Sequence, residues 1–375
     1  MIVAGCPRAP DWTIDWPALD AAYDWVRALR DCPQEPAHHG EGDVWIHTRM
    51  VVEALAARPA FRALPADARE LVFAAALMHD IGKPATTKQE SDGKITSRGH
   101  SRRGELMARR ILWELDVPFL ARESVTQLIR YHQVPFFLID RDDRQKQAIL
   151  VSQSTRCDHL ALVAEADLRG RVAADQARIL DQVALFVEYC RDERCLDGPR
   201  AFASAHSRFA YFRRPGRDPD YAAHDETRGE LVLMSGLPGA GKDWVARTRY
   251  GALPQVSLDG VRARLGIGPR DNQKPVVHAA QEEARALLRT HARFVVNGTN
   301  LSRDLRRQWI DLADAYGART TIVYVEQPRA RLLAQNRERE AVVPPAAIER
   351  MLARWEVPDA TEAHAIEFVI GAERT

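Results

Sequence analysis

The chain has 375 residues, of which 46% are hydrophobic and 28% charged, and its formal net charge is +1. This length predicts two or three domains, and the composition excludes wholesale disorder. The near-zero charge balance excludes a protein that binds polyanions through bulk charge, so a nucleic-acid contact would need a local basic patch.

The cysteines and the apolar runs predict the cellular compartment of the protein. Five scattered cysteines form no CxxC pair, which fits free thiols in a reducing environment. No apolar run approaches the roughly 20 residues that span a bilayer, and the N-terminal segment lacks the pattern of a secretory signal. We therefore expect a soluble, cytoplasmic protein without a membrane partner.

The two halves of the chain have different sequence patterns. Residues 12 to about 205 show helical periodicity throughout and are rich in Ala, Leu and Arg. From Glu230 onward, short β-rich runs alternate with amphipathic helical segments, a pattern typical of a parallel, doubly wound sheet. Residues 213–228 carry two prolines, one glycine and many charges, which indicates a linker. We predict an all-α domain over 1–212, a linker over 213–228 and an α/β domain over 229–375.

The predicted strands of the second domain are LVLMSG (231–236), PQVSLD (254–259), FVVNGT (294–299), TTIVYVE (320–326) and AIEFVI (365–370). The helices expected between them cover residues 242–248, 276–293 and 302–316.

Histidines and aspartates recur through the helical half at positions that adjacent helices can aim into one bundle core. His79 and Asp80 follow an apolar run, and imidazole with carboxylate suits a divalent metal. A single histidine on a helix is more often a core or surface residue, so the prediction depends on the whole set. The candidate ligands are His47, His79, Asp80, His100, His132 and Asp167. His38 and His39, in a Pro/Gly-rich loop, are expected to be solvated.

The order His…His-Asp…His…His…Asp, with the stretches HDIGKPATT and GHSRRG, resembles the HD phosphohydrolase superfamily. The most similar variety is the HD domain appended to bacterial tRNA nucleotidyltransferases, over roughly residues 40–170. The resemblance implies a dinuclear centre of divalent transition metal (Mn, Ni, Co, Zn, Cu or Fe). Its core ligands would be His47, His79, Asp80 and Asp167, and His100 with His132 would complete a second site.

Cations near this motif are candidates for contacting phosphate. Lys83 is placed four residues beyond His79, and Arg102 and Arg103 lie beside His100. We expect Lys83 to neutralise a substrate phosphate; the alternative is that it only stabilises a helix end.

A glycine-rich turn follows the first predicted strand. Residues 236–241 fit G-x-x-x-x-G, and Lys242 then opens a predicted helix. The phosphates of ATP or another NTP with Mg²⁺ would bind to the backbone amides of Gly236, Gly239, Ala240 and Gly241. Lys242 would reach the β/γ oxygens. Asp243 replaces the usual Ser or Thr that contacts Mg²⁺, so the carboxylate would hold the ion directly or through water.

Asp259 and Arg262 form the candidate acceptor side. Asp259 ends the second predicted strand, and carboxyl edges of such strands face the ligand crevice. It would accept the proton of an acceptor hydroxyl, while Arg262 would contact nearby phosphate. The alternative for Asp259 is a helix N-cap. The polar run 297–300 would orient the acceptor, and Ser302 would cap the next helix.

An arginine-bearing segment over 330–340 is the candidate lid. Arg331, Arg337 and Arg339 could close over the phosphates. The alternative is a charged, solvated helix face that also includes Glu338 and Glu340.

This half resembles the P-loop 5′-OH polynucleotide kinases of the phage end-healing type and their small-molecule kinase relatives, over about residues 230–360. The resemblance rests on the GLPGAGK loop, the Asp259/Arg262 pair, NGTNLSR and the Asn-x-x-Arg segment at 336–339. It implies catalytic roles for Lys242, Asp259, Arg262 and Arg339, with Arg337 also at the nucleotide. Gln335 stands where the phage-type lid often carries arginine, and Arg337 would substitute for it.

Together the halves resemble the bacterial bifunctional HD-domain phosphohydrolase–polynucleotide kinases. This implies healing of RNA or DNA ends: a kinase for 5′-OH ends and a phosphohydrolase for 2′,3′-phosphate or cyclic-phosphate ends, with any RNA ligase on a separate chain. One alternative is a small-molecule or nucleotide kinase joined to a nucleotide phosphohydrolase. Another is a non-catalytic, nucleotide-sensing switch. The sequence leaves open whether the chain forms a homo-oligomer.

Overall fold

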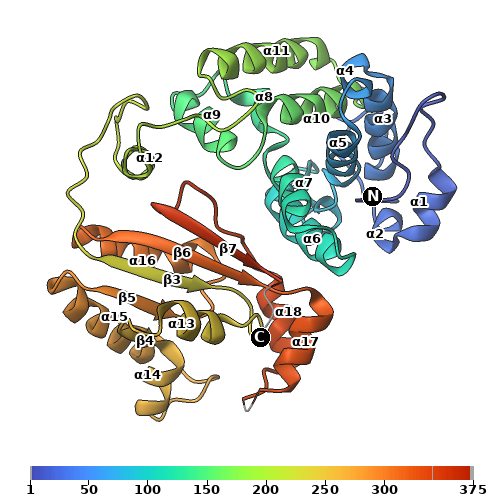
Figure 1. Ribbon diagram of the computed structural model, residues 1–375. Coiled ribbons are helices and arrows are strands. Elements are labelled where there is room, and N and C mark those ends of the chain that lie inside the picture. Colours follow the sequence, from blue (N-terminus) through green and yellow to red (C-terminus); the bar gives the residue numbers. More distant parts are fainter. Residues whose placement is uncertain (1, 340, 372–375) are drawn as a thin grey trace. The chain divides into compact units, whose positions relative to one another are not determined.

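The computed structural model describes residues 2–339 and 341–371. It contains two compact units that divide between Arg200 and Ala201 (Figure 1). The first unit is helical apart from one short hairpin, and the second is built on a parallel sheet. The predicted fold class, an all-α domain followed by an α/β domain, is confirmed.

The helices described in the first unit are α1 (Trp16–Ala22), α2 (Asp24–Arg27), α3 (Val44–Ala57), α4 (Pro59–Arg62), α5 (Ala66–Met78), α6 (His100–Glu114), α7 (Phe119–Tyr131), α8 (Val134–Phe137), α9 (Arg144–Ser152), α10 (Cys157–Arg169) and α11 (Gln176–Asp192). A 3-10 turn covers Lys83–Ala85. The sequence analysis did not predict the hairpin that β1 (Lys88–Gln89) forms with β2 (Ile95–Thr96).

Helix α5 is the centre of the first unit. Every residue from Val72 to Met78 is buried, and α5 packs against α3, α7 and α10. A helix that is apolar all round has to lie inside a bundle, because each of its faces needs an apolar partner. Its C-terminal end therefore delivers His79 and Asp80 to the interior of the unit.

The second unit contains strands β3 (Glu230–Ser235), β4 (Gln255–Ser257), β5 (Arg293–Asn297), β6 (Arg319–Glu326) and β7 (Ala365–Ile370). Their spatial order is β4-β5-β3-β6-β7, and all pairs are parallel. Strand β3 pairs with β5 on one side and β6 on the other, so the strand order reverses at β3. Ligands of open α/β sheets bind outside the carboxyl ends of the strands at such a point.

Helices α13 (Lys242–Tyr250), α14 (Leu258–Arg264), α15 (Lys274–Arg289), α16 (Arg303–Ala315), α17 (Arg329–Arg337) and α18 (Pro345–Leu352) complete this unit, together with α12 (Ala205–Arg213) before the sheet. Ser302 caps α16 as predicted, because its Oγ accepts from Leu305 N. Strand β4 is shorter than predicted. It ends at Ser257, whose side chain caps α14 by accepting from Gly260 N at 3.2 Å.

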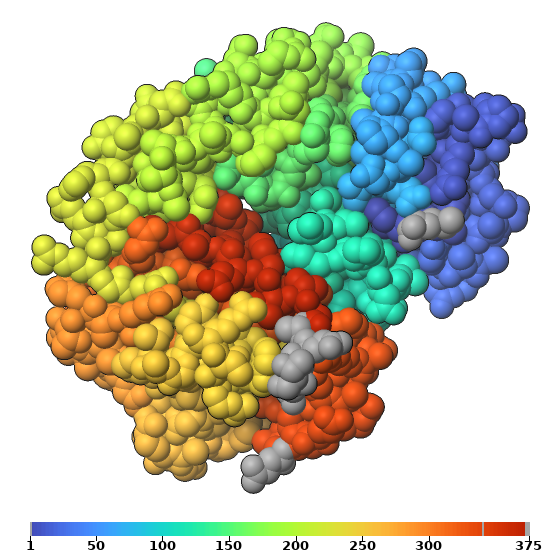
Figure 2. All heavy atoms as spheres, in the orientation of Figure 1, coloured from blue at the N-terminus to red at the C-terminus, as the bar shows by residue number. Residues whose placement is uncertain are grey.

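Helix α12 belongs with the second unit, although the sequence analysis placed it in the first domain. Phe209 lies in the core of the second unit, and its ring stacks on His364 with centroids 3.9 Å apart. Arg208 donates to the carbonyl oxygens of Ala360 and His364 at 2.9 and 2.8 Å. In Figure 2 this yellow-green segment lies against the orange and red surface of the same unit. These partners lie more than 150 residues away, so no local pattern could indicate them.

Among the described residues, no helix is both long enough and apolar enough to cross a membrane.

Candidate metal centre and nucleotide-binding loop

The six predicted metal ligands converge in the interior of the first unit. They come from α3, from the C-terminal ends of α5 and α7, from the first residue of α6, and from α10. All six are buried: His47, His79, Asp80, His100, His132 and Asp167.

The six side chains form two adjoining groups. His47 Nε2 lies 3.3 Å from His79 Nε2 and 3.1 Å from Asp167 Oδ1. In the second group, His100 Nε2 lies 3.4 Å from His132 Nε2 and 3.4 Å from Asp80 Oδ1. The other oxygen of Asp80, Oδ2, lies 3.2 Å from His79 Nε2. Asp80 thus directs one carboxylate oxygen to each group, as a residue that bridges two ions must.

Backbone carbonyls orient three of the imidazoles. Nδ1 of His79 is 2.7 Å from Ala76 O, Nδ1 of His100 is 2.9 Å from Ser97 O, and Nδ1 of His132 is 2.8 Å from Ile129 O. A carbonyl oxygen only accepts, so each Nδ1 carries the proton and donates it. With Nδ1 as the donor, Nε2 of a neutral ring is a lone-pair donor, and in all three residues Nε2 faces the centre, which is the arrangement of metal-binding histidines.

The protonation states also suit metal binding. Burial lowers the pKa of His132 to about 3, and it lowers the pKa of His100 as well. Although burial opposes ionisation of Asp80, the nearby charge of Lys83 holds its pKa well below the usual range. Asp80 Oδ1 is buried and accepts no hydrogen bond within the described part of the chain. An uncompensated carboxylate oxygen among imidazole lone pairs fits divalent metal ions.

Lys83 contacts the centre directly. Its Nζ lies 2.7 Å from Asp80 Oδ2 and 2.5 Å from Gln34 Oε1, and the side chain is almost fully buried. It also lines a cavity of about 480 Å³ beside the centre, together with His39, His100 and Arg171. A phosphate group in this cavity would thus meet the ammonium group of Lys83.

The sequence analysis missed two charged residues of the centre. Arg171 makes two hydrogen bonds to Asp167, at 2.9 and 2.7 Å, and it also lines the cavity. The i,i+4 spacing from Asp167 was the signal that could have found it. Glu41 Oε1 lies 2.9 Å from His47 Nδ1, and Glu41 Oε2 accepts from Val172 N at 2.8 Å. No local pattern marks Glu41, because one partner, Val172, lies 131 positions away and the other two, His39 and His47, reach it only through the turn of the backbone.

The structure corrects two predictions about residues next to the centre. His39 is not solvated: its side chain is 10% exposed, and its Nδ1 lies 2.8 Å from Glu41 Oε1. The backbone turn at residues 38–42 brings Glu41 between His39 and His47, which explains the burial. Arg102 and Arg103 are exposed and are not among the described residues that line the cavity. The cations that line it are Lys83, Arg98, Arg171 and Arg178.

The glycine-rich loop lies between β3 and α13, at the reversal point of the sheet. Gly239 and Gly241 have φ of +82° and +96°, which disfavours any residue with a side chain. A Cβ at Gly236 would lie 2.2 Å from Val325 O, and one at Gly239 would lie 2.7 Å from Leu332 O. Space around Gly241 is open, so a phosphate can approach the backbone there.

Lys242 folds back into the loop. Its Nζ donates to Leu237 O at 2.9 Å, and the side chain is buried. Burial lowers the pKa of Lys242 to about 8, and the charges of Asp243, Arg339 and Asp259 all act on it. Charged residues proposed for the nucleotide and for the acceptor thus both act electrostatically on Lys242.

Asp243 is held at the carboxyl edge of the sheet. Its Oδ1 accepts a hydrogen bond of 2.7 Å from Asn297 Nδ2, and Asn297 is the last residue of β5. Asn297 belongs to the polar run that the sequence analysis assigned to the acceptor, so the structure brings the acceptor edge and the loop together.

Asp259 lies in the first turn of α14, and not at the end of a strand. The N-cap of α14 is Ser257, so the alternative reading of Asp259 as the cap is wrong. The carboxylate of Asp259 is paired with Arg262 and remains 73% exposed, while Arg262 Nε donates to Gln273 at 2.9 Å. Asp259 therefore has room for an incoming hydroxyl group.

The arginine-bearing segment begins in α17. Arg337 is exposed, whereas Arg339 is half-buried and acts electrostatically on Lys242. Gln335, with its amide oriented to satisfy both ends, donates to Gly239 O at 2.7 Å and accepts from Arg331 at 3.2 Å. Gln335 thus supports the loop instead of contacting phosphate. Glu340 lies outside the described residues.

Comparison with known proteins assigns a class to each unit. Residues 44–167 match the family model described as HD domain, and residues 231–358 match the one described as AAA domain. The chain thus combines an HD domain with a P-loop, kinase-like domain.

Individual relatives cover only part of the chain. A multifunctional CCA protein of Xanthomonas euvesicatoria pv. vesicatoria is 36% identical over 172 residues, which are 44% of this chain and 38% of that protein. This chain therefore spans well under half of that relative. A solved Pnkp1/Rnl/Hen1 RNA repair complex is 18% identical, with a TM-score of 0.31, over 36% of this chain and 46% of the other. A gluconokinase from Sinorhizobium meliloti 1021 is 19% identical, with a TM-score of 0.30, over 40% and 86% respectively.

Proposed function

We propose that the chain heals nucleic-acid ends with two activities. The C-terminal unit transfers phosphate from ATP or another NTP to a 5′-OH, and the N-terminal unit removes 2′,3′-phosphate or cyclic phosphate. The observation that carries the proposal is the presence in one chain of two separate sites whose chemistry suits phosphate: a buried His/Asp centre beside a cationic cavity, and a glycine-rich loop at a sheet reversal.

In the N-terminal unit, His47, His79, Asp80 and Asp167 would hold one divalent ion, and His100 with His132 and Asp80 a second. Bound metal supplies Lewis acidity toward phosphate oxygens and activates water. The chain's own residues prepare this site. Glu41 and the backbone carbonyls orient the imidazoles, and Lys83 and Arg171 place positive charge where the cavity meets the centre.

In the C-terminal unit, Lys242 and the loop amides bind the triphosphate, and Asp259 accepts the proton of the acceptor hydroxyl. Arg262 orients Asp259, and Arg339 contributes positive charge near Lys242. The exposure of Asp259 suits a bulky acceptor that presents its hydroxyl from solvent. This favours a polynucleotide end over an enclosed metabolite. The description of curated relatives as multifunctional CCA proteins adds support for a nucleic-acid substrate. The proposed substrates are RNA or DNA ends, and any ligase would be a separate chain.

To test the proposal, the protein is incubated with γ-labelled ATP and one of three acceptors. These are a 5′-OH oligonucleotide, the same oligonucleotide with a 5′-phosphate, and a mixture of nucleosides and sugars. Label on the 5′-OH oligonucleotide alone is expected. In parallel, oligonucleotides with 2′,3′-cyclic phosphate ends should lose phosphate only when divalent transition metal is present.

Two outcomes would refute the proposal. Label only on small metabolites would favour a metabolite kinase, and ATP turnover that is indifferent to any acceptor would favour a nucleotide-sensing switch. Asp259→Asn provides a further check. It should reduce transfer by about 10²–10⁴-fold, the usual contribution of a positioned base, and leave ATP affinity unchanged.

A further inference from the structure

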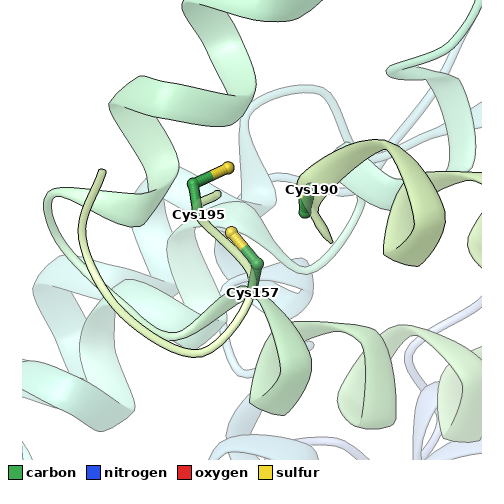
Figure 3. Close-up of side chains that lie close together, drawn as sticks. All are labelled: Cys157, Cys190 and Cys195. Carbon is green, nitrogen blue, oxygen red and sulfur yellow. The ribbon is translucent and has the colours of Figure 1, made fainter. Parts of the chain in front are cut away.

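Three of the five cysteines lie together in the first unit. They are separate from the group of six predicted metal ligands described above, here called the HD centre. Cys157, Cys190 and Cys195 come from the start of α10, the end of α11 and the loop that follows α11 (Figure 3). Each is 0% exposed, and their three Sγ atoms all lie within 4.8 Å of one another. All three are free thiols. They form a side-chain cluster with the donor atoms that soft metal ions prefer.

The end of α11 places two of these thiols side by side. Arg194 adopts a left-handed conformation with φ of 54°, and Cys195 N donates to Cys190 O at 2.8 Å. Arg194 N donates to Arg191 O at 2.9 Å. This pair of hydrogen bonds is a Schellman motif, which brings the side chains at its two ends into contact. Here those side chains are Cys190 and Cys195, so backbone geometry sets their separation before any metal binds.

A backbone hydrogen bond brings the third thiol to the same place. Asp158 N donates to Leu196 O at 2.9 Å, which ties the first turn of α10 to the residue after Cys195. Cys157 is the first residue of α10, so this hydrogen bond fixes its position relative to Cys195. The cluster is therefore held by two hydrogen-bonded backbone segments and does not depend on side-chain rotamers alone.

The three thiols are buried together, so an ionised thiol in the cluster needs a compensating positive charge. A thiolate inside an apolar core is costly unless a cation neutralises it. A metal ion would do so, and its binding would release the thiol protons.

We propose that Cys157, Cys190 and Cys195 bind one thiophilic metal ion, of the Zn²⁺ or Cu⁺ class, at a structural site separate from the HD centre. Cys157 and Asp167 are ten residues apart on α10, which is about 15 Å along the helix. The two sites thus sit at opposite ends of one helix. Three thiolates complete a trigonal Cu⁺ site, whereas Zn²⁺ would take a fourth ligand from water.

The experiment uses the full-length protein, reduced and stripped of metal with a chelator, and titrates it with Co²⁺. Thiolate ligands give a near-ultraviolet sulfur-to-cobalt charge-transfer band that imidazole and carboxylate ligands do not. The band is expected to saturate when one Co²⁺ per chain is bound at the thiols, in addition to any Co²⁺ that the six His/Asp residues take up. Zn²⁺ or Cu⁺ added afterwards should abolish it, and the ion that does so at the lower concentration identifies the preferred metal.

Matched variants locate the site. Cys157→Ser should lose the band and one metal equivalent, whereas Cys32→Ser should keep both, because Cys32 is a buried thiol of the same unit outside the cluster. If Cys157→Ser fails to fold, the wild-type titration still decides. A folded wild-type protein that shows no charge-transfer band would overturn the proposal. A Cys190–Cys195 disulfide, found by peptide mapping in protein that takes up no metal, would overturn it too.

Discussion

At the scale of single residues, we expect Lys242 to couple protonation to nucleotide binding. Burial lowers its pKa from 10.5 to about 8 in the folded chain. Between these two values the unfolded chain retains a proton that the folded chain has released. The free energy of unfolding therefore rises with pH across this window, and Lys242 contributes no such slope below it.

A bound triphosphate would restore the proton to Lys242. We predict that ATP binding at pH 9 takes up about one proton, and that binding at pH 7 takes up almost none. Calorimetry in buffers of different ionisation enthalpy measures this number directly. Lys242→Arg should show no uptake at either pH, because a guanidinium remains protonated. Equal uptake in the arginine variant would assign the proton to another group.

Asp243 replaces the hydroxyl residue that usually contacts Mg²⁺ in such loops, and it is hydrogen-bonded to Asn297. A carboxylate beside a triphosphate repels it unless a cation lies between them. We predict that Asp243→Ser retains kinase activity and weakens the Mg²⁺ dependence of ATP binding. Asp243→Lys should be inactive, because an ammonium group cannot bind the metal.

The measurement is ATP affinity titrated against Mg²⁺ in the wild type and the serine variant. Asn297→Ala provides the control, because it releases Asp243 without removing its charge and should preserve the metal dependence. Identical Mg²⁺ dependence in the wild type and Asp243→Ser would show that Asp243 does not face the cation.

At the scale of elements, helix ends build the HD centre. His79 and His132 directly follow α5 and α7, and His100 opens α6. At such positions a carbonyl three residues earlier is within reach of Nδ1, so each ring is oriented by its own chain segment. His47 differs, because it lies inside α3 and its Nδ1 faces groups from other segments: Glu41 Oε1 at 2.9 Å and Gly170 O at 3.2 Å.

Glu41 therefore acts on metal binding through His47. We predict that Glu41→Gln lowers metal affinity by about 10–100-fold, the usual effect of losing a group that orients a metal-binding histidine. Competition with a chromogenic chelator measures the change. Glu35→Gln is the matched control, since Glu35 is a loop carboxylate that accepts from Ile95 N at 2.9 Å. Equal losses in both variants would indicate a general effect on the loop.

At the scale of the whole molecule, the two units have separate hydrophobic cores and separate sites. The core of the first is centred on α5, and the core of the second lies along β3, β5 and β6. No residue of one proposed site belongs to the other. The two activities should therefore be separable by mutation.

We predict that Lys242→Ala lowers kinase activity by at least about 10²–10³-fold, because a charge aimed at the transferring phosphate is lost. Phosphohydrolase activity should stay within a few-fold of the wild type. Asp80→Ala should show the reverse pattern, with loss of bound transition metal. Parallel assays of both variants on the two kinds of oligonucleotide end check this. Loss of both activities from a folded Lys242→Ala protein would contradict separate sites.

The sequence by itself determined the features that depend on local pattern. The alternation of β-rich and helical runs predicted the parallel sheet, and the spacing in residues 236–242 predicted the loop before α13, because strand, turn and helix are set by adjacent residues. The order of the six HD residues also predicted which side chains converge. Their roles as ligands stay predictions until metal is measured.

Only the tertiary structure decided the contacts that join distant segments. Glu41 meets Val172 across 131 positions, α12 packs on residues near His364, and Cys157 meets the end of α11 through the fold of the loop at Arg194. Such contacts follow from how helices pack, and packing depends on the volumes and directions of many side chains together. A local pattern records a residue's neighbours in the chain, and it carries no information about which remote group will lie opposite.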